Sequence, residues 1–225
     1  MTTKPTETIE DYLGIIYTLQ RDGEEVIGAR LAEILDVSAP TVTVTLKRML
    51  RDGWVKIDDK KHVSLTKKGV DAAKSVIRRH MLTEWLLSRV LHIPLSELHE
   101  EAHKIEHTIS SQVEEQLIVS LDDPDLCPHG NPFPGQEIVS EGWLPLTQFE
   151  NGDWVTIHRI HEFLEDDHEI ITALVKEKIY PGVTVQINNF NSEKNILYIT
   201  INGKQKKLSS EIAQKIFAKI QNNEN

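Results

Sequence analysis

The chain has 225 residues, of which 39% are hydrophobic and 27% are charged, as is ordinary for a globular protein. No apolar run approaches the roughly eighteen residues that a membrane span requires, and the N-terminal segment lacks the apolar stretch of a secretory signal. The one cysteine, Cys127, excludes an internal disulfide, so we expect a cytoplasmic protein without a membrane partner.

The net charge of −10 is unevenly distributed along the chain. Residues 1–74 carry 12 basic and 12 acidic side chains, whereas residues 75–142 carry 4 and 12, and residues 143–225 carry 9 and 11. Within the first segment, residues 38–74 hold 9 basic against 4 acidic side chains. Local basic charge is what phosphate contacts require, and an acidic segment is where a cation would bind.

Residues 8–65 predict a winged helix-turn-helix. Apolar residues at spacings of three and four predict a helix over 8–20, which Arg21-Asp22-Gly23 ends. A short helix over 27–35 follows, and Ser38 is the expected N-cap of a third helix that ends before Gly53. Two strands over 54–57 and 62–65 complete the order of elements.

The N-terminal residues of a recognition helix meet the major groove of DNA. Hydroxyl groups can contact phosphates or bases, methyl groups can contact thymine, and cations can contact phosphates. The predicted DNA-binding residues are Ser38, Pro40, Thr41, Thr43, Val44, Lys47, Arg48 and Arg51, with Lys60 and Lys61 between the strands. The alternative is a winged helix that docks a protein and has a solvated basic face.

Two long helices and a small β domain are predicted in the rest of the chain. The helices cover residues 70–91 and 95–121, and a Pro/Gly-rich loop covers 122–136. Strands are predicted over 154–160, 183–188, 196–201 and 204–208, with Asn202-Gly203 as a hairpin turn. A closing helix over 209–220 and a polar tail end the chain. We therefore expect a mainly α protein with three domains, 1–74, 75–142 and 143–225.

The second long helix carries side chains of the metal-ligand type. A helix advances about 100° per residue, so ligands spaced by three and four residues share one stripe. Imidazole and carboxylate suit Mn²⁺, Fe²⁺, Zn²⁺ or Co²⁺, and clustering them is costly unless a cation organises them. The stripe consists of His99, His103, Glu106 and His107, and His80 and Glu84 repeat the spacing upstream. A metal site that follows a DNA-binding unit favours a sensor over an enzyme.

Other chemistries are open at the same residues. His103-Lys104-Ile105-Glu106-His107 matches the H-x-x-E-H motif of some zinc metallopeptidases, in which Glu106 would be the general base. Glu100 and His103 match the E-x-x-H of diiron bundles, which needs a second such motif that the sequence lacks. Cys127 and His129 could form half a zinc site, but without a second pair a structural loop is preferred. Residues 165–169 are interpreted as a solvated acidic turn from which one side chain could reach a metal.

These motifs resemble, over nearly the whole chain, the family of the diphtheria toxin repressor and the manganese transport regulator. The resemblance rests on Thr8-Ile9-Glu10-Asp11-Tyr12-Leu13, Ser38-Ala39-Pro40-Thr41-Val42, Arg79-His80 with Glu84, His99-x-x-x-His103-x-x-Glu106-His107 and Cys127-Pro128-His129-Gly130-Asn131-Pro132. It implies a homodimeric repressor of metal homeostasis genes that binds a palindromic operator with a divalent metal as corepressor and no small organic ligand. It also implies a helical dimerisation and metal-binding domain and an SH3-like (FeoA-type) C-terminal domain.

The resemblance implies two metal sites. Carried onto this sequence, the primary site consists of Asp11, His103, Glu106 and His107. The ancillary site consists of His80, Glu84 and His99, with Asp167 as the nearest match by spacing for a ligand from the C-terminal domain.

The sequence departs from the family pattern at positions 103, 14 and 44, and at position 11 it distinguishes between the two types of member. Position 103 is cysteine in the iron-type members and glutamate in the manganese-type members, whereas here it is histidine. Asp11 is shared with the manganese type, so Mn²⁺ is favoured, then Fe²⁺, with Zn²⁺ or Co²⁺ also able to bind in vitro. Gly14 replaces an acidic ligand of the compact manganese regulators, so their two-metal cluster cannot form identically. Val44 replaces a polar base-contacting residue, so the operator sequence does not transfer.

Overall fold

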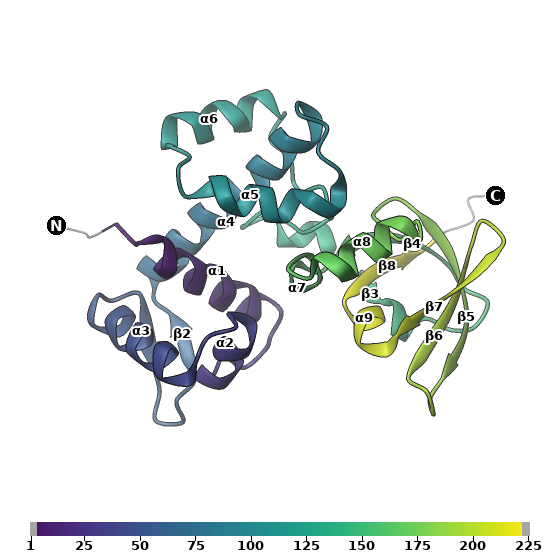
Figure 1. The fold of residues 1–225 in the computed structure, drawn as a ribbon, viewed down its shortest axis with the longest axis horizontal. Coiled ribbons are helices and arrows are strands. Elements are labelled where there is room, and N and C mark those ends of the chain that lie inside the picture. The colour runs from purple at the N-terminus through teal and green to yellow at the C-terminus, as the bar shows by residue number, and fades with distance from the viewer. Residues whose placement is uncertain (1–3, 222–225) are drawn as a thin grey trace. The chain divides into compact units, whose positions relative to one another are not determined.

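The computed structural model describes residues 4–221, and the chain divides into two units, residues 1–79 and 80–225 (Figure 1). The division falls within the long helix α4 (Lys67–Arg89), which was predicted over residues 70–91. The boundaries of three domains remain a prediction, and their outer ends, residues 1–3 and 222–225, lie outside the described residues.

Unit 1 has the predicted order of helices and strands. Its elements before α4 are α1 (Glu7–Arg21), α2 (Gly28–Ile34), α3 (Ala39–Arg51), β1 (Val55–Ile57) and β2 (Val63–Leu65). The two strands pair antiparallel, with Lys56 opposite Ser64. The apolar stripe of α1 is buried, as its spacing predicts, and Ile9, Leu13 and Ile16 are almost inaccessible to solvent.

The N-cap of α3 is the one that the sequence predicts. The Ser38 hydroxyl accepts a hydrogen bond from the backbone N–H of Thr41, and Pro40 lies in the first turn, where a missing N–H leaves no bond unmade. The inner face of α3 buries Val42, Leu46 and Met49. Its opposite face is therefore held toward solvent.

The helices of unit 2 differ from the prediction of one helix over 95–121, which is wrong. After a short 3₁₀ turn, η1 (Leu95–Glu97), helix α5 (Leu98–Glu106) ends and helix α6 (Ser111–Ser120) begins. The Thr108 hydroxyl donates to the Ile105 carbonyl, and the Ser110 hydroxyl accepts from the Val113 N–H as N-cap of α6. Both side chains satisfy backbone groups that a continuous helix would pair internally, and this ends one helix and starts the next.

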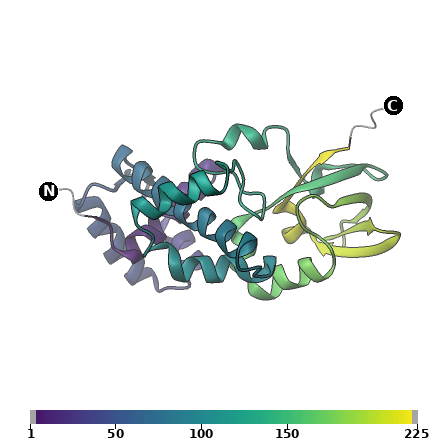
Figure 2. The ribbon, with the colours of Figure 1, turned by 90° about the horizontal axis from the view of Figure 1, so that it is seen from above.

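The C-terminal part of unit 2 is a six-stranded antiparallel sheet in the order β3-β8-β4-β5-β6-β7. Its strands are β3 (Leu144–Pro145), β4 (Trp154–Ile160), β5 (Thr184–Asn191), β6 (Ile196–Ile201), β7 (Lys204–Ser209) and β8 (Ile216–Ile220). The predicted strands β4 to β7 are confirmed, and Figures 1 and 2 show them side by side toward the C-terminus. The hairpin turn also forms as predicted, with Asn202 and Gly203 both at positive φ.

The predicted closing helix over 209–220 is wrong. Only α9 (Ser210–Gln214) is helical, and the residues after it form β8, which pairs with β3 and β4. Ile216 and Ala218 are buried in alternation along β8, a period of two rather than 3.6. The 3₁₀ turns η2 (Glu137–Ser140) and η3 (Leu146–Gln148), the strand β3, and the helices α7 (Glu162–Glu165) and α8 (His168–Lys176) were not predicted.

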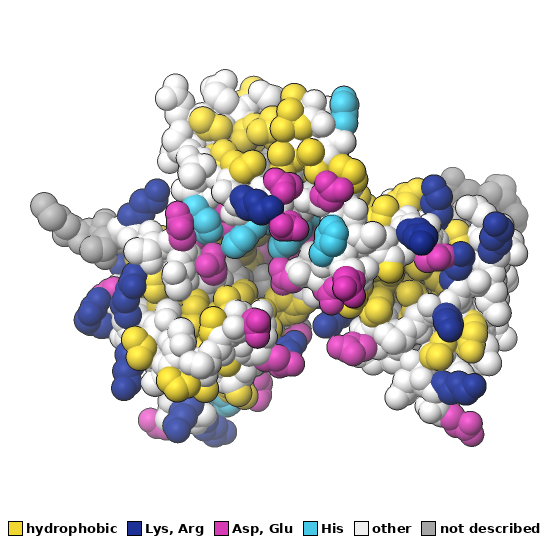
Figure 3. Space-filling model, in the orientation of Figure 1, with side chains coloured by type: hydrophobic (Ala, Val, Ile, Leu, Met, Phe, Trp, Pro, Cys, Tyr) yellow, Lys and Arg dark blue, Asp and Glu magenta, His cyan; other side chains and the backbone are white. Residues whose placement is uncertain are grey.

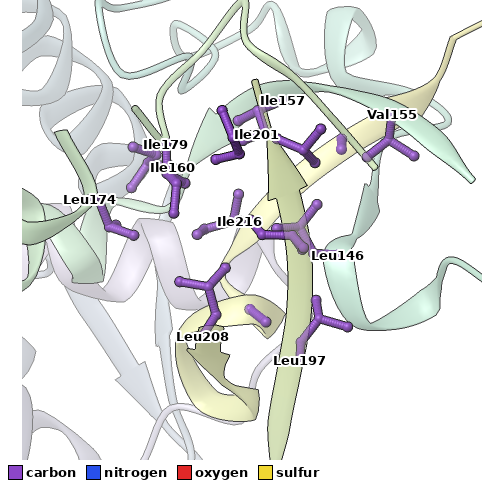
Figure 4. Packing of buried hydrophobic residues seen from close by; sticks show 14 of the residues in the cluster. Leu146, Val155, Ile157, Ile160, Leu174, Ile179, Leu197, Ile201, Leu208 and Ile216 are labelled. Atoms are coloured by element: carbon purple, nitrogen blue, oxygen red, sulfur yellow. The ribbon is translucent and has the colours of Figure 1, made fainter. Parts of the chain in front are cut away.

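Helices α7 and α8 are held by the core of the sheet. Figure 4 shows Leu174 of α8 with Ile160 and Ile179 in that core, and Leu164 of α7 is buried in the same cluster. Because Leu164 is fixed there, the next residue, Glu165, is also fixed. None of the helices within residues 4–221 is both long and apolar enough to cross a membrane.

Candidate metal centre

Histidine and carboxylate side chains form two groups in unit 2. The first, called here the buried group, consists of His80, Glu84, His99 and Glu165. The second, called the outer group, consists of His103, Glu106 and His107. Figure 3 shows histidine and acidic side chains beside one another over α5.

The buried group is built on α4 and α5. His80 and Glu84 lie one turn apart on α4, with His80 Nε2 3.4 Å from Glu84 Oε1. The His99 ring, in the first turn of α5, is tilted by 58° to the His80 ring with 4.6 Å between the ring centroids, and His99 Nδ1 lies 4.0 Å from the same Glu84 oxygen. Three of the four predicted ancillary residues are therefore brought together.

The fourth residue of the buried group is Glu165 instead of Asp167. Glu165 is buried on α7, and its Oε2 lies 3.2 Å from His99 Nδ1. Asp167 is the N-cap of α8, where its Oδ1 accepts hydrogen bonds from the backbone of Glu169 and Ile170. An aspartate before a run of apolar residues at helical spacing signals an N-cap, and this could have separated Asp167 from the ligands. The interpretation of residues 165–169 as a solvated turn is therefore wrong for Glu165. The expectation that one side chain of this turn could reach a metal fits Glu165.

The charges of the buried group call for a cation. Both oxygens of Glu84, His80 Nε2 and His99 Nδ1 are buried and have no hydrogen-bond partner among the described residues. Burial alone would lower the pKa of His80, but the Glu106 and Glu84 carboxylates raise it to about 9. Burial, with Glu84 nearby, raises the pKa of Glu165. A divalent cation would satisfy these carboxylates and imidazole nitrogens together, so the donor set fits such an ion.

The outer group lies at the end of α5. Its three residues keep the predicted spacing, because His107, the C-cap, retains helical backbone angles. Glu106 Oε1 lies 3.4 Å from His103 Nδ1 and 3.5 Å from His107 Nε2. His103 is half exposed, whereas Glu106 is buried. The fourth predicted ligand, Asp11, belongs to α1 in unit 1.

Glu106 connects the two groups. Its Oε2 contacts His80 Nδ1 in the buried group, while its Oε1 faces His103 and His107. Burial by itself would raise the pKa of Glu106, but the hydrogen bonds with His103 and His80 lower it to about 2. This carboxylate is therefore ionised at neutral pH and already engaged by imidazoles, which does not suit the free general base of a peptidase. Glu100, the candidate diiron ligand, pairs with Lys104 at 2.8 Å.

The loop of residues 127–131 contacts the buried group through His129. The sequence was interpreted there as a structural loop, yet His129 is fully buried with its Nδ1 3.1 Å from Glu84 Oε1 and 3.3 Å from Glu165 Oε2. Its Nε2 lies 2.9 Å from the carbonyl oxygen of Leu95. Burial and the nearby Glu84 carboxylate raise the pKa of the Cys127 thiol well above its usual value.

The predicted DNA-binding residues lie on the solvent face of unit 1. All ten are exposed: Ser38, Pro40, Thr41, Thr43, Val44, Lys47, Arg48, Arg51, Lys60 and Lys61. Val44 is 69% exposed, an unusual place for an isopropyl group and one from which it could contact a thymine methyl. Arg48 donates to the Thr6 hydroxyl, and Arg51 pairs with Asp52. Both cations are therefore already paired within unit 1.

Comparison with known families matches three consecutive parts of the chain. Residues 4–63 match "Iron dependent repressor, N-terminal DNA binding domain". Residues 66–135 match "Iron dependent repressor, metal binding and dimerisation domain", and residues 144–220 match the FeoA domain.

Individual proteins are similar over nearly their whole length. The iron-dependent repressor IdeR of Mycobacterium leprae (strain TN) is 35% identical over 204 residues, which cover 86% of this chain and 89% of that protein. The structure of the manganese regulator SloR has a TM-score of 0.80 at 29% identity and covers 97% of this chain and 100% of its own. A manganese-dependent transcriptional repressor in complex with manganese has a TM-score of 0.83 at 27% identity, over 95% and 100% of the two chains.

Proposed function

Because this chain belongs to the iron-dependent repressor family, it is a metal-dependent DNA-binding repressor rather than an enzyme, and we propose that Mn²⁺ or Fe²⁺ is its corepressor. It has an N-terminal DNA-binding domain, a helical metal-binding and dimerisation domain, and a C-terminal FeoA domain of the SH3-like type. The metallopeptidase alternative is not supported. The homodimer binds a palindromic operator in the cytoplasm, where its DNA target lies, and controls genes of metal homeostasis.

One observation supports metal dependence more strongly than the others. The Glu84 carboxylate is fully buried among imidazoles, and neither of its oxygens has a hydrogen-bond partner among the described residues. A buried carboxylate in that condition is costly unless a cation is bound. When bound, a divalent ion supplies the positive charge that fixes these side chains in one arrangement.

The ligand types support Mn²⁺ before Fe²⁺, with Zn²⁺ and Co²⁺ as ions that bind in vitro. Carboxylates are hard donors that suit Mn²⁺, while imidazole suits Fe²⁺ and Zn²⁺ better. The outer group offers the Glu106 carboxylate and two imidazoles. The names of the similar proteins include both iron and manganese regulators. Binding titrations at buffered free Mn²⁺, Fe²⁺ and Zn²⁺ rank the ions.

Asp11 is proposed as the ligand that completes the outer group. This proposal rests on the sequence, because an aspartate at this position is a mark of the manganese-type members that the chain resembles. The other three residues lie on or directly after α5 of unit 2, whereas Asp11 lies on α1 of the DNA-binding unit. A set of ligands drawn from both units would couple metal binding to DNA binding. Such a coupling free energy between two sites is what makes the metal an allosteric effector.

Asp11→Ala is expected to abolish the metal dependence of DNA binding. The variant should bind operator DNA in Mn²⁺ as weakly as the parent does in chelator, about tenfold or more below the parent with metal, because one ligand of the outer group is lost. Fluorescence anisotropy of a labelled operator measures this. Asp71→Ala, an exposed aspartate of α4 in the same unit, is the control and should behave as the parent. If Asp11→Ala still bound tightly only with metal, Asp11 would not be a ligand.

The buried group is proposed as the ancillary site, with Glu165 rather than Asp167 as the ligand from the C-terminal domain. Glu165→Gln should reduce the metal content after equilibrium dialysis from two ions per chain to one, because glutamine lacks the anionic charge. Asp167→Asn should keep two ions, since asparagine also caps a helix. Elemental analysis gives both counts. The reverse pattern would restore the original assignment of Asp167.

A further inference from the structure

We infer that Arg159, on β4, is a positioning residue for the metal site of the buried group. Through the side chain of Asn131, Arg159 fixes the orientation in which Glu165 presents its carboxylate to the histidines of that group. The inference rests on the proposed ancillary site, in which Glu165 is a ligand. It adds two residues that hold this ligand in place and are not ligands themselves.

The orientation of the Asn131 amide is set by the chemistry of its neighbours. Arg159 Nε donates to Asn131 Oδ1, and Asn131 Nδ2 donates to Glu165 Oε1 and, at 2.8 Å, to the backbone carbonyl of Ile160. A guanidinium group has only donors, so the amide has to turn its oxygen toward Arg159. A carbonyl and a carboxylate oxygen accept, so the amide nitrogen has to face Ile160 and Glu165. The three contacts therefore agree on one orientation.

The two oxygens of Glu165 have different surroundings as a result. Oε1 accepts from the Asn131 amide, whereas Oε2 lies 3.2 Å from His99 Nδ1 and 3.3 Å from His129 Nδ1. One oxygen is thus held from behind while the other is directed at imidazole nitrogens. A hydrogen bond to a ligating carboxylate of this kind orients the ligand, and its loss typically weakens metal binding.

Arg159 is itself held rigidly. It is 6% exposed, its guanidinium group lies 4.8 Å from the centre of the Phe217 ring on β8, and its Nη2 donates to Glu162 Oε2 at 2.9 Å. Glu162 is the first residue of α7, the helix that carries Glu165. Because the guanidinium group is a planar fork, its Nε and Nη2 fix the positions of Asn131 and Glu162 together. Arg159 therefore holds α7 at two points.

The consequence is a connection between the sheet and the buried group within unit 2. Three residues of the buried group, His80, Glu84 and His99, lie on α4 and α5, whereas Glu165 is oriented by a residue of β4. A buried arginine could also serve only to stabilise the fold. The two roles differ in one respect: a positioning residue acts on metal affinity through Glu165, and a stabilising residue does not.

Zn²⁺ affinity of the full chain tests this, measured by competition with a chromophoric chelator. A His103→Ala/His107→Ala background removes the outer group from the measurement. Arg159→Lys keeps the positive charge but loses the fork, so it should bind Zn²⁺ about tenfold to 100-fold more weakly than the background. Arg89→Lys is the matched control, because Arg89 also lies over an aromatic ring, that of Trp85. It should stay within about twofold of the background.

Combination with Glu165→Gln separates positioning from stabilisation. If Arg159 acts through Glu165, then Arg159→Lys should cause no further loss of Zn²⁺ affinity once Glu165→Gln is present. Equal factors of loss with and without Glu165→Gln, or full affinity of Arg159→Lys, would overturn the inference and leave the ancillary site standing. Full affinity of Glu165→Gln alone would overturn both the ligand role of Glu165 and the inference.

Asn131→Asp provides a second variant that keeps the partner of Arg159. The aspartate still accepts from the guanidinium group, but it places an acceptor where Glu165 Oε1 needs a donor. Zn²⁺ affinity should again fall by about tenfold or more, and Asn131→Asp should add no loss to Glu165→Gln, since the glutamine amide can donate to the aspartate. Circular dichroism in chelator checks that each variant is folded. Unchanged affinity of folded Asn131→Asp would contradict the inference.

Discussion

Glu106→Gln is expected to cause the largest loss of metal-dependent DNA binding of any single substitution in unit 2. Glu106 is buried, and one of its oxygens faces His103 and His107 while the other contacts His80. Glutamine removes the negative charge from the outer group and keeps only one acceptor oxygen, so it cannot face imidazoles of both groups with an acceptor as Glu106 does. The affinity for operator DNA in the presence of metal should fall by about 100-fold or more, because both groups are damaged.

The control for this substitution is on the same helix. Glu101 is a half-exposed residue of α5 that pairs with Lys104, so Glu101→Gln should change DNA binding little. Affinities measured by anisotropy, together with the metal content of each variant, separate loss of metal from loss of coupling. Metal-dependent DNA binding of Glu106→Gln close to that of the parent would contradict the role given to this carboxylate.

The second large effect is expected from Gly130→Ala. Gly130 has φ +88°, and an added Cβ would lie 1.8 Å from the carbonyl oxygen of His158. Backbone atoms cannot move aside as the end of a flexible side chain can. The loop of residues 127–131 therefore has to move away from β4, and it carries His129 with it. We expect a loss of about 3–5 kcal/mol in the free energy of unfolding, together with weaker Zn²⁺ binding at the buried group.

Gly152→Ala separates the clash from the backbone strain. Gly152 also has a positive φ, of +101°, but nothing lies within 4 Å of its added Cβ. Its substitution should lower the free energy of unfolding by only about 1 kcal/mol and leave metal binding unchanged. Denaturant unfolding of both variants makes the comparison. Equal destabilisation would show that the contact with His158 does not hold the loop.

Local patterns in the sequence predicted the parts of the fold that depend on neighbouring residues. Ser38 and Pro40 marked the start of α3, and Asn202-Gly203 marked the hairpin between β6 and β7. The spacing of His103, Glu106 and His107 placed them together even though the helix that follows was wrong, because all three precede the break at Thr108. Such features are set by interactions within about one helical turn.

Glu165 and His129, which the sequence analysis considered but did not assign to a metal site, are brought to the buried group by long-range packing. Glu165 is 66 residues from His99, and its helix α7 is only four residues long, too short for a periodic signal. His129 lies in a loop without repeating structure, fixed by β4. The strand β8 was mistaken for a helix. Its five residues are too few to show a period of two in the sequence, and its burial pattern depends on the pairing with β4.

The central claim is that a divalent metal held by these groups controls DNA binding. The most direct measurement is an anisotropy titration of the full chain on a labelled fragment from its own upstream DNA, in chelator and in buffered Mn²⁺ or anaerobic Fe²⁺. The account predicts tight binding with metal and, in chelator, binding weaker by about tenfold to 100-fold, the usual range of allosteric coupling. Equal affinity with and without metal would contradict it.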